Sequence, residues 1–151
     1  MQVSGISLFL NKTEITERVL QKTKSVLIPA QILPDGSQPL ELERATSLYY
    51  SVFNLRGLFK LAKIGDRIGI DLWNFKTDRG AGLQNALNYL LPYLSNKSSW
   101  PYLQNGSIDM YEVAALLDQA SMHYPYSELY KQAYRSIDRN YVNADIDKLV
   151  N

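Results

Sequence analysis

Apolar side chains recur at helical spacing along most of the chain, most clearly in residues 43–64. The apolar positions there are separated by 4, 3, 4 and 3 residues, at Leu48, Val52, Leu55, Phe59 and Ala62. At about 100° per residue, this spacing places them on one narrow face of a helix. Gly65 follows and predicts the end of that helix. Apolar Tyr49 and Phe53 on another flank indicate that neighbours cover more than one side.

Other segments show the same period. Residues 13–27 predict a helix that Thr13 can cap, and Pro29 is expected to prevent its continuation. The first twelve residues, MQVSGISLFLNK, suggest the end of a buried helix or strand whose beginning lies outside this chain. They lack the basic start and the cleavage site of a signal peptide. Further helices are expected at residues 81–94, 107–124 and 126–136, with a last turn at 144–150.

The ends of these later helices are also marked in the sequence. Pro92 should end or kink the helix of residues 81–94. The helix of residues 107–124 has two candidate caps, Ser107 and Asp109, because either side chain can accept from a free backbone N–H.

The connections are long. Residues 28–42 contain three prolines and the Asp35-Gly36 pair, which predict an ordered turn segment. Residues 66–80 permit either a short strand or an irregular packed loop. Residues 95–106 predict a polar loop anchored by Trp100 and Tyr102. We therefore predict an all-α protein, one domain over residues 1–151, built from consecutive antiparallel helix hairpins.

Composition narrows the function classes. The formal net charge is +1, from 16 Lys and Arg against 15 Asp and Glu, so a general electrostatic grip on nucleic acid or an anionic membrane is not expected. No stretch approaches the roughly 18 apolar residues of a membrane span. The chain has no cysteine, and its single histidine, His123, has no partners at metal-ligand spacing. Disulfides, thiolate chemistry and a metal site are not predicted.

Three stretches carry a family resemblance. DGSQPLELERATSLYYSVFNL (35–55), GIDLWNFKTDRGAGLQNALNYLLPYL (69–94) and WPY (100–102) resemble the C-terminal half of the alginate lyase family of polysaccharide lyases. The resemblance covers roughly residues 3–135. It implies part of an incomplete α/α toroid and β-elimination on a uronate-containing polysaccharide such as alginate. It also implies a periplasmic or secreted location.

The implied chemistry needs a cation and a phenol. Removing the C5 proton of a uronate is hard because the adjacent carboxylate resists further negative charge, and a donor that neutralises it stabilises the transition state. A free phenol has a pKa of about 10, so it needs a nearby cation to work near neutral pH. By motif, Arg44 matches the arginine that closes the DG-x-x-P segment, and Tyr50 matches the acid/base tyrosine. We assign substrate binding to Tyr49, Asn54, Trp73 and Trp100. No metal or organic cofactor is required.

Helix geometry sets a condition on this pair. In one continuous helix, Arg44 and Tyr50 would project about 120° apart, so they converge only if Arg44 lies at or before the first turn. Which of Tyr49 and Tyr50 faces a cleft stays open. The duller interpretations are a surface ion pair of Arg44 with Glu41 or Glu43, and tyrosines that only pack between helices.

The chain also departs from the family. The upstream Asn-Asn-His motif, whose side chains neutralise the carboxylate and take the proton, has no match here, and His123 stands in an unrelated SMHYPY segment. The chain is therefore expected to be the second half of a lyase domain, with the missing half or a second copy as its partner. An inactive carbohydrate-binding or protein-interaction module is the alternative. A third hypothesis is a helical scaffold with an exposed apolar strip.

Overall fold

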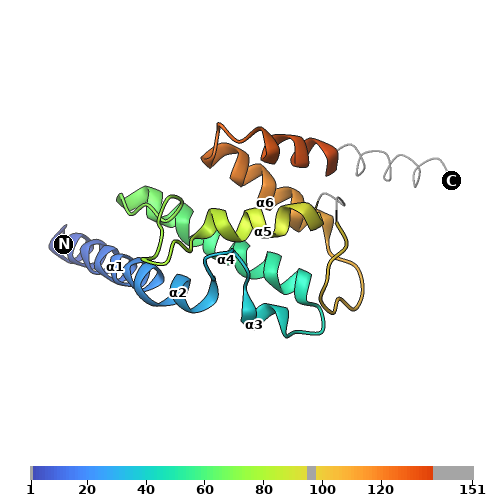
Figure 1. The fold of residues 1–151 in the computed structure, drawn as a ribbon. Coiled ribbons are helices and arrows are strands. Elements are labelled where there is room, and N and C mark those ends of the chain that lie inside the picture. The colour runs from blue at the N-terminus through green and yellow to red at the C-terminus, as the bar shows by residue number, and fades with distance from the viewer. Residues whose placement is uncertain (1, 95–97, 138–151) are drawn as a thin grey trace.

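Helices form the whole framework of the molecule (Figure 1). The computed structural model describes residues 2–94 and 98–137, with side chains from residue 12 onward. Within these ranges there is no named strand, and one isolated bridge joins Thr46 to Gln104. The all-α prediction is confirmed. The helices are α1 (Gln2–Lys22), the π-helix η1 (Thr23–Leu27), α2 (Ile28–Gln31), α3 (Pro39–Leu42), α4 (Ser47–Ile68), α5 (Leu83–Leu94) and α6 (Met110–His123); residues 128–137 are also helical.

The N-terminal helix continues past Pro29, contrary to the predicted stop. The five-residue π-helical turn η1 precedes α2, and Pro29 occupies the first turn of α2. The wider π turn just before it accommodates the proline, which has no N–H to donate back into that turn. The hydroxyl of Thr23 donates to the carbonyl oxygen of Val19 at 2.9 Å, a side-chain bond typical of helix bends. Ile28, fully buried, then directs α2 into the core.

The central element is α4, which packs against α1, α3, α5 and α6. Its predicted apolar face is confirmed, since all five of its members are buried: Leu48, Val52, Leu55, Phe59 and Ala62. An ion pair between Arg56 and Glu112 joins α4 to α6 at the surface. Burial of this kind stabilises the folded state by about 1.5–3 kcal/mol for each large apolar side chain. Helix α4 is therefore the central element of the core.

Both predicted ends of α4 are wrong by four residues. The helix begins at Ser47, and it ends at Ile68 with Gly69 in the left-handed conformation at φ 75°. Gly65 lies inside the helix rather than after it. A Cβ on Gly65 would come within 2.2 Å of the carbonyl oxygen of Ile70. Glycine is required there because the chain turns back over the last helical turn, and the N–H of Ile70 donates to the oxygen of Gly65 at 2.9 Å.

Residues 69–82 form the irregular packed loop, and the strand alternative is wrong. Leu72 is buried in the core, and the loop closes with a turn in which Thr77 and Ala81 are hydrogen bonded through their backbones at 2.8 Å. Helix α5 runs two residues past Pro92. A proline so near the end of a helix removes one backbone bond and leaves the remaining turn intact.

At α6 the cap is Asp109, whose carboxylate accepts from the N–H of Tyr111 at 2.9 Å, so Ser107 does not cap this helix. The helix predicted at 126–136 is present at 128–137. The turn predicted at 144–150 lies outside the described residues.

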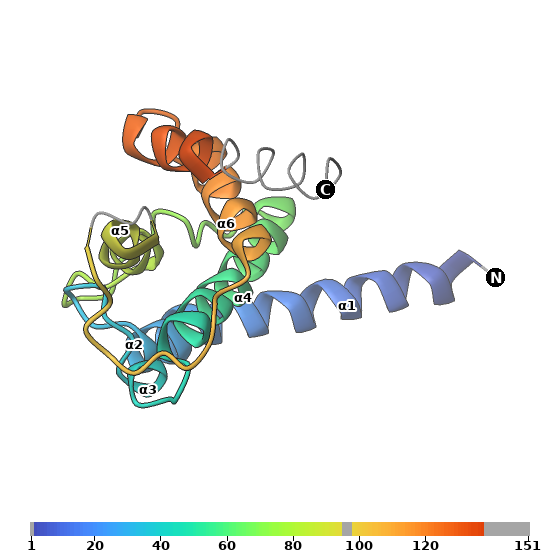
Figure 2. The ribbon, with the colours of Figure 1, turned by 90° about the vertical axis from the view of Figure 1, so that its right-hand side faces the viewer.

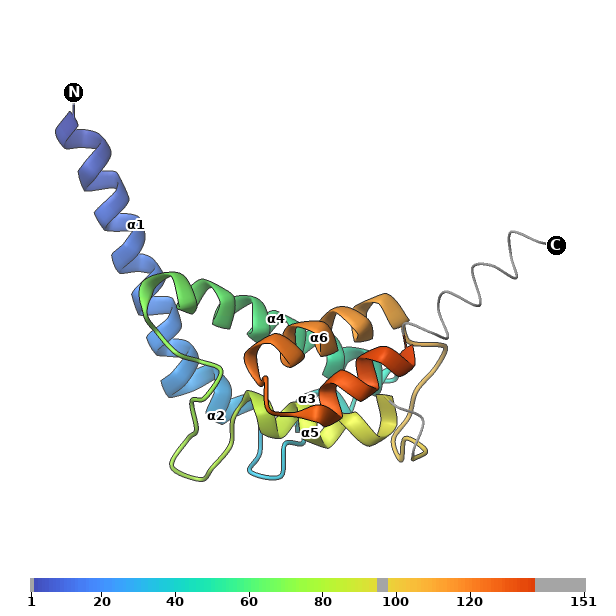
Figure 3. The same cartoon turned by 90° about the horizontal axis from the view of Figure 1, so that it is seen from above.

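Helix α1 projects beyond the rest of the molecule, with the N-terminus at its far end (Figures 2 and 3). Ile15, Val19 and Val26 are exposed along α1 and η1. The helical-scaffold hypothesis expects exposed apolar side chains of this kind, and it stays a hypothesis. Among the residues that the structure describes, no helix is long and apolar enough to cross a membrane.

Candidate active site

A tight turn at residues 35–37 precedes α3 and Arg44 in the chain. The carboxylate of Asp35 accepts from the backbone N–H of Ser37 at 2.9 Å and from its hydroxyl at 2.7 Å. The hydrogen bonds from the Ser37 side chain and backbone lower the pKa of Asp35. Gly36 has φ 90°, and a Cβ there would come within 2.0 Å of the carbonyl oxygen of Asn85 in α5. The side-chain amide of Asn85 in turn donates to the oxygen of Pro34 at 3.0 Å. The turn is thus fixed against α5.

Arg44 lies beside Tyr50, just ahead of α4. The guanidinium carbon of Arg44 is 4.4 Å from the centre of the Tyr50 ring, and its Nε donates to Glu41 at 2.7 Å. The Arg44 side chain is 49% exposed, whereas that of Glu41 is 11% exposed. The buried carboxylate of Glu41 therefore orients the Arg44 guanidinium over the Tyr50 ring. The geometric condition is met because α4 starts at Ser47, which leaves Arg44 outside the helix.

The guanidinium keeps donors for a ligand. Among the described residues, Glu41 is the one ion-pair partner of Arg44, and it takes Nε. The two terminal nitrogens form the fork that matches a carboxylate. A carboxylate bound there would lie next to the Tyr50 ring, and a cation over a ring face adds about 0.5–2 kcal/mol to the pair.

Tyr49 and Asn54 border this pair. The Tyr49 ring meets Tyr50 edge to face at 5.3 Å and stacks on exposed Phe53 at 6.1 Å. The amide nitrogen of Asn54 donates at 2.8 Å to Gln38, which is buried and also donates to the carbonyl oxygen of Ser51 at 3.1 Å. The structure thus places Tyr50, not Tyr49, under the guanidinium.

The loop after α5 is hydrogen bonded to the first turn of α4. Gln104 accepts through Oε1 from the N–H groups of Leu48 at 2.9 Å and Tyr49 at 3.2 Å. It caps α4 from 55 and 56 residues away in sequence. Sequence reasoning missed Gln104, because a cap is normally sought among the residues just before a helix. Its bonds fix the first turn, from which Tyr49 and Tyr50 project.

Trp100 anchors the same loop. Its indole N–H donates to the hydroxyl of Ser47 at 2.8 Å, and that hydroxyl donates to the oxygen of Leu103 at 2.7 Å. Trp100 is half-buried and sits edge-on to Tyr93, with ring centres 4.8 Å apart. The structure therefore brings Trp100 to the N-terminal end of α4, where Arg44 and Tyr50 lie.

Two further tyrosines complete an aromatic wall. The Tyr102 ring centre is 5.3 Å from that of Trp100, and the hydroxyl of Tyr89 lies 3.2 Å from the hydroxyl of Tyr102. Burial, together with the bond to Tyr102, raises the pKa of Tyr89. Tyr89 consequently stays protonated near neutral pH, and it suits packing or hydrogen bonding better than proton abstraction.

Trp73 requires a correction. We predicted a sugar-stacking role, but the ring is 3% exposed and packs edge-on against Phe59, with centres 4.8 Å apart. His123 stacks on it at 3.7 Å, and its indole N–H donates to Asp66 at 3.1 Å. A sugar needs an open ring face, so Trp73 belongs to the core.

The arrangement offers a forked cation, a phenol and an aromatic border. Within the described residues, no group of three or more histidines and carboxylates lies close enough to hold a metal ion. The guanidinium fork of Arg44 can bind an anionic group, and the Tyr50 phenol beside it offers a hydroxyl for proton transfer.

Comparisons with known proteins give a consistent answer. The family model described as alginate lyase matches residues 1–100. The chain is also similar to an alginate lyase from Bacteroides ovatus with a solved crystal structure, at 31% identity and a TM-score of 0.77. The match covers 89% of this chain and 36% of that one, so the chain spans about a third of that relative's length. No curated protein matches the sequence.

Proposed function

The chain belongs to the alginate lyase family, and from this premise we propose that it takes part in β-elimination on a uronate-containing polysaccharide. The observation that carries the proposal is the Arg44 guanidinium seated 4.4 Å over the Tyr50 ring. The all-α fold is that of part of an α/α toroid. Family membership supports an acidic polysaccharide as the ligand and a periplasmic or secreted location.

In this reaction the C5 proton of a uronate leaves and a C4=C5 double bond forms. The bond from C4 to the glycosidic oxygen breaks, and that oxygen receives a proton. Arg44 would bind the carboxylate and stabilise the charge that develops on it. Tyr50 would act as general acid, and as base when deprotonated, at the glycosidic oxygen and C5. Tyr49, Asn54 and Trp100 would border the sugar, each held by the bonds described above.

One observation favours a second candidate, an inactive carbohydrate-binding module. His123, the single histidine of the chain, stacks on Trp73 and lies 3.8 Å from Asp66. None of these contacts involves Arg44 or Tyr50, so no imidazole in the described chain assists proton removal there. On this alternative the chain binds the polymer without cleaving it, or needs a further part of a lyase domain or a second copy to complete the site.

One experiment separates the two. The purified chain is mixed with alginate, with glucuronan and with neutral dextran, and ultraviolet absorbance of the unsaturated product is followed while binding is measured by calorimetry. We expect steady product from a uronate polymer and none from dextran. Binding to the uronate polymers without product supports the module. Absence of both product and binding contradicts the proposal.

A further inference from the structure

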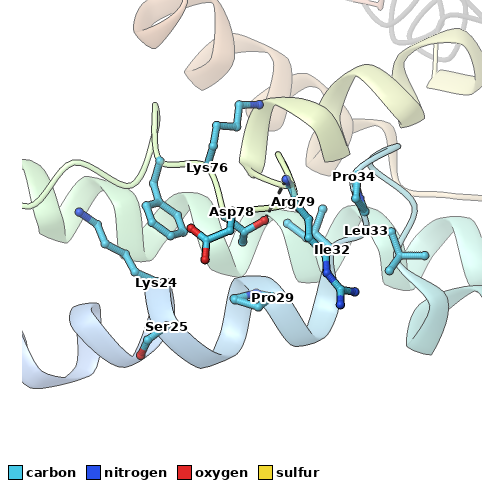
Figure 4. Close-up of a pocket in the computed structure, with 12 residues that line it drawn as sticks. Lys24, Ser25, Pro29, Ile32, Leu33, Pro34, Lys76, Asp78 and Arg79 are labelled. Carbon is cyan, nitrogen blue, oxygen red and sulfur yellow. Dashed lines mark hydrogen bonds between the residues drawn. The ribbon is translucent and has the colours of Figure 1, made fainter.

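A cavity lies away from Arg44, between the bend of η1 and α2 and the loop after α4 (Figure 4). Its volume is about 520 Å³. Pockets for small organic ligands fall at about 300–1,000 Å³. None of the residues around Arg44 lines it, and its apolar wall consists of Pro29, Ile32, Leu33, Pro34 and Phe75.

The charged side chains in this cavity come from two separate elements. Lys24 reaches up from η1 and places its amine 5.4 Å from the centre of the Phe75 ring. Arg79 extends into the cavity from the loop after α4, and Asp78 lies between Lys24 and Arg79 (Figure 4). No ion pair joins these three groups among the described residues. Two cations against one carboxylate is a local excess in a chain whose net charge is only +1.

The loop that carries Asp78 and Arg79 holds one shape. The N–H of Ala81 donates to the hydroxyl of Thr77 at 3.0 Å, and the N–H of Gly80 donates to the Thr77 carbonyl oxygen at 2.8 Å. A Cβ on Gly82 would lie 2.4 Å from the oxygen of Phe75, so the loop packs tightly on itself. A preformed loop binds with a smaller entropy loss than one that must order.

Lys76 points away toward α5, where its amine donates to the side-chain oxygen of Asn85. Burial lowers its pKa. It therefore braces the rim rather than contacting a ligand in the cavity.

We propose that this cavity is a second binding site for an acidic oligosaccharide, in which separate carboxylates pair with Lys24 at one end and Arg79 at the other, and sugar hydroxyl groups donate to Asp78 between them. A simple anion such as phosphate would be repelled by the carboxylate of Asp78. A sugar acid can pair its carboxylates with the cations and donate its hydroxyl groups to Asp78. The C–H faces of a sugar ring also fit a wall of proline, aliphatic and aromatic side chains. The choice of uronate rests on the proposed function, but the existence of the site does not.

The test is a titration of the ¹⁵N-labelled chain with trimannuronate, with neutral maltotriose and with inorganic phosphate. We expect trimannuronate to shift the amide signals of residues 24–28, 30–33 and 76–81, and neither control to do so. Arg79→Gln and Lys24→Gln should each weaken that binding roughly tenfold. Lys63→Gln, an exposed lysine on α4 outside the cavity, should leave it unchanged.

Arg44→Gln keeps this site apart from the first. If the shifts at residues 76–81 persist in Arg44→Gln, the cavity binds independently, whatever the lyase assay shows. Shifts confined to the neighbourhood of Arg44, equal shifts with phosphate or maltotriose, or unchanged affinity in Arg79→Gln would overturn the inference.

Discussion

Replacing Tyr50 by Phe should lower the rate of unsaturated-product formation by about 10²–10⁴-fold, the usual contribution of a positioned general acid or base. Phe keeps the ring on which the Arg44 guanidinium rests, 4.4 Å away, and removes the hydroxyl alone. The free energy of unfolding should therefore change little. The rate is measured by ultraviolet absorbance with a uronate polymer, and the folded state is checked by circular dichroism.

Two matched variants sharpen this result. Tyr126→Phe removes a hydroxyl from a fully exposed tyrosine just after the end of α6 and should keep the wild-type rate. Tyr49→Phe should lose less activity than Tyr50→Phe, because Tyr49 meets Tyr50 edge-on and not the guanidinium. A larger loss in Tyr49→Phe would move the acid/base role to Tyr49.

Gly36→Ala should lower the free energy of unfolding by about 2–5 kcal/mol. Its φ of 90° costs a side chain about 1–2 kcal/mol, and overpacking adds about 1–3 kcal/mol. The added Cβ would fall 2.0 Å from the Asn85 carbonyl oxygen, a backbone atom that cannot rotate aside. The measurement is urea unfolding followed by circular dichroism.

Gly80→Ala is the control for this effect. Gly80 has φ 85° but nothing within 4 Å of a built Cβ, so only the conformational cost applies. The difference between the two variants isolates the contact of the turn with α5. Equal losses in Gly36→Ala and Gly80→Ala would show that this close approach does not hold the turn that leads to Arg44.

The buried face of α4 was predictable because a regular spacing reports directly on burial. Leu48 stands four residues before the next apolar position on that face, and Phe59 stands three before the next. Both side chains are buried. The meeting of Arg44 with Tyr50 was also anticipated, on the condition that the arginine precede the helix. That condition holds because α3 and the turn after it end the earlier segment at Arg44, whose N–H donates to the oxygen of Glu41 at 3.2 Å.

The start of α4 could not be read locally. Glu43, Arg44 and Ala45 all favour helix. Distant residues decide otherwise, since the N–H of Asn105 donates to Ala45 at 2.9 Å and Gln104 caps the following turn. Likewise, a glycine after an apolar stripe predicts the end of a helix. Gly65 instead lies inside α4, where the backbone of Ile70 passes too close for a Cβ, and this contact forms only in the folded chain.

Trp73 shows the same limit at the level of the site. A tryptophan in a loop offers a flat face for sugar, and nothing in the local sequence says that the face is covered. His123, fifty residues later, supplies the cover by stacking at 3.7 Å. Trp100, equally a loop tryptophan, was brought to the start of α4 by its bond to Ser47.

The central claim is that Arg44 and Tyr50 together receive a sugar carboxylate. The most direct measurement is a titration of ¹⁵N-labelled Tyr50→Phe, which should bind without turnover, with trimannuronate. The account predicts shifts at the amide signals of residues 44, 50 and 104, and their loss when Arg44→Gln is added. Signals at these positions that stay still while trimannuronate binds elsewhere would contradict it.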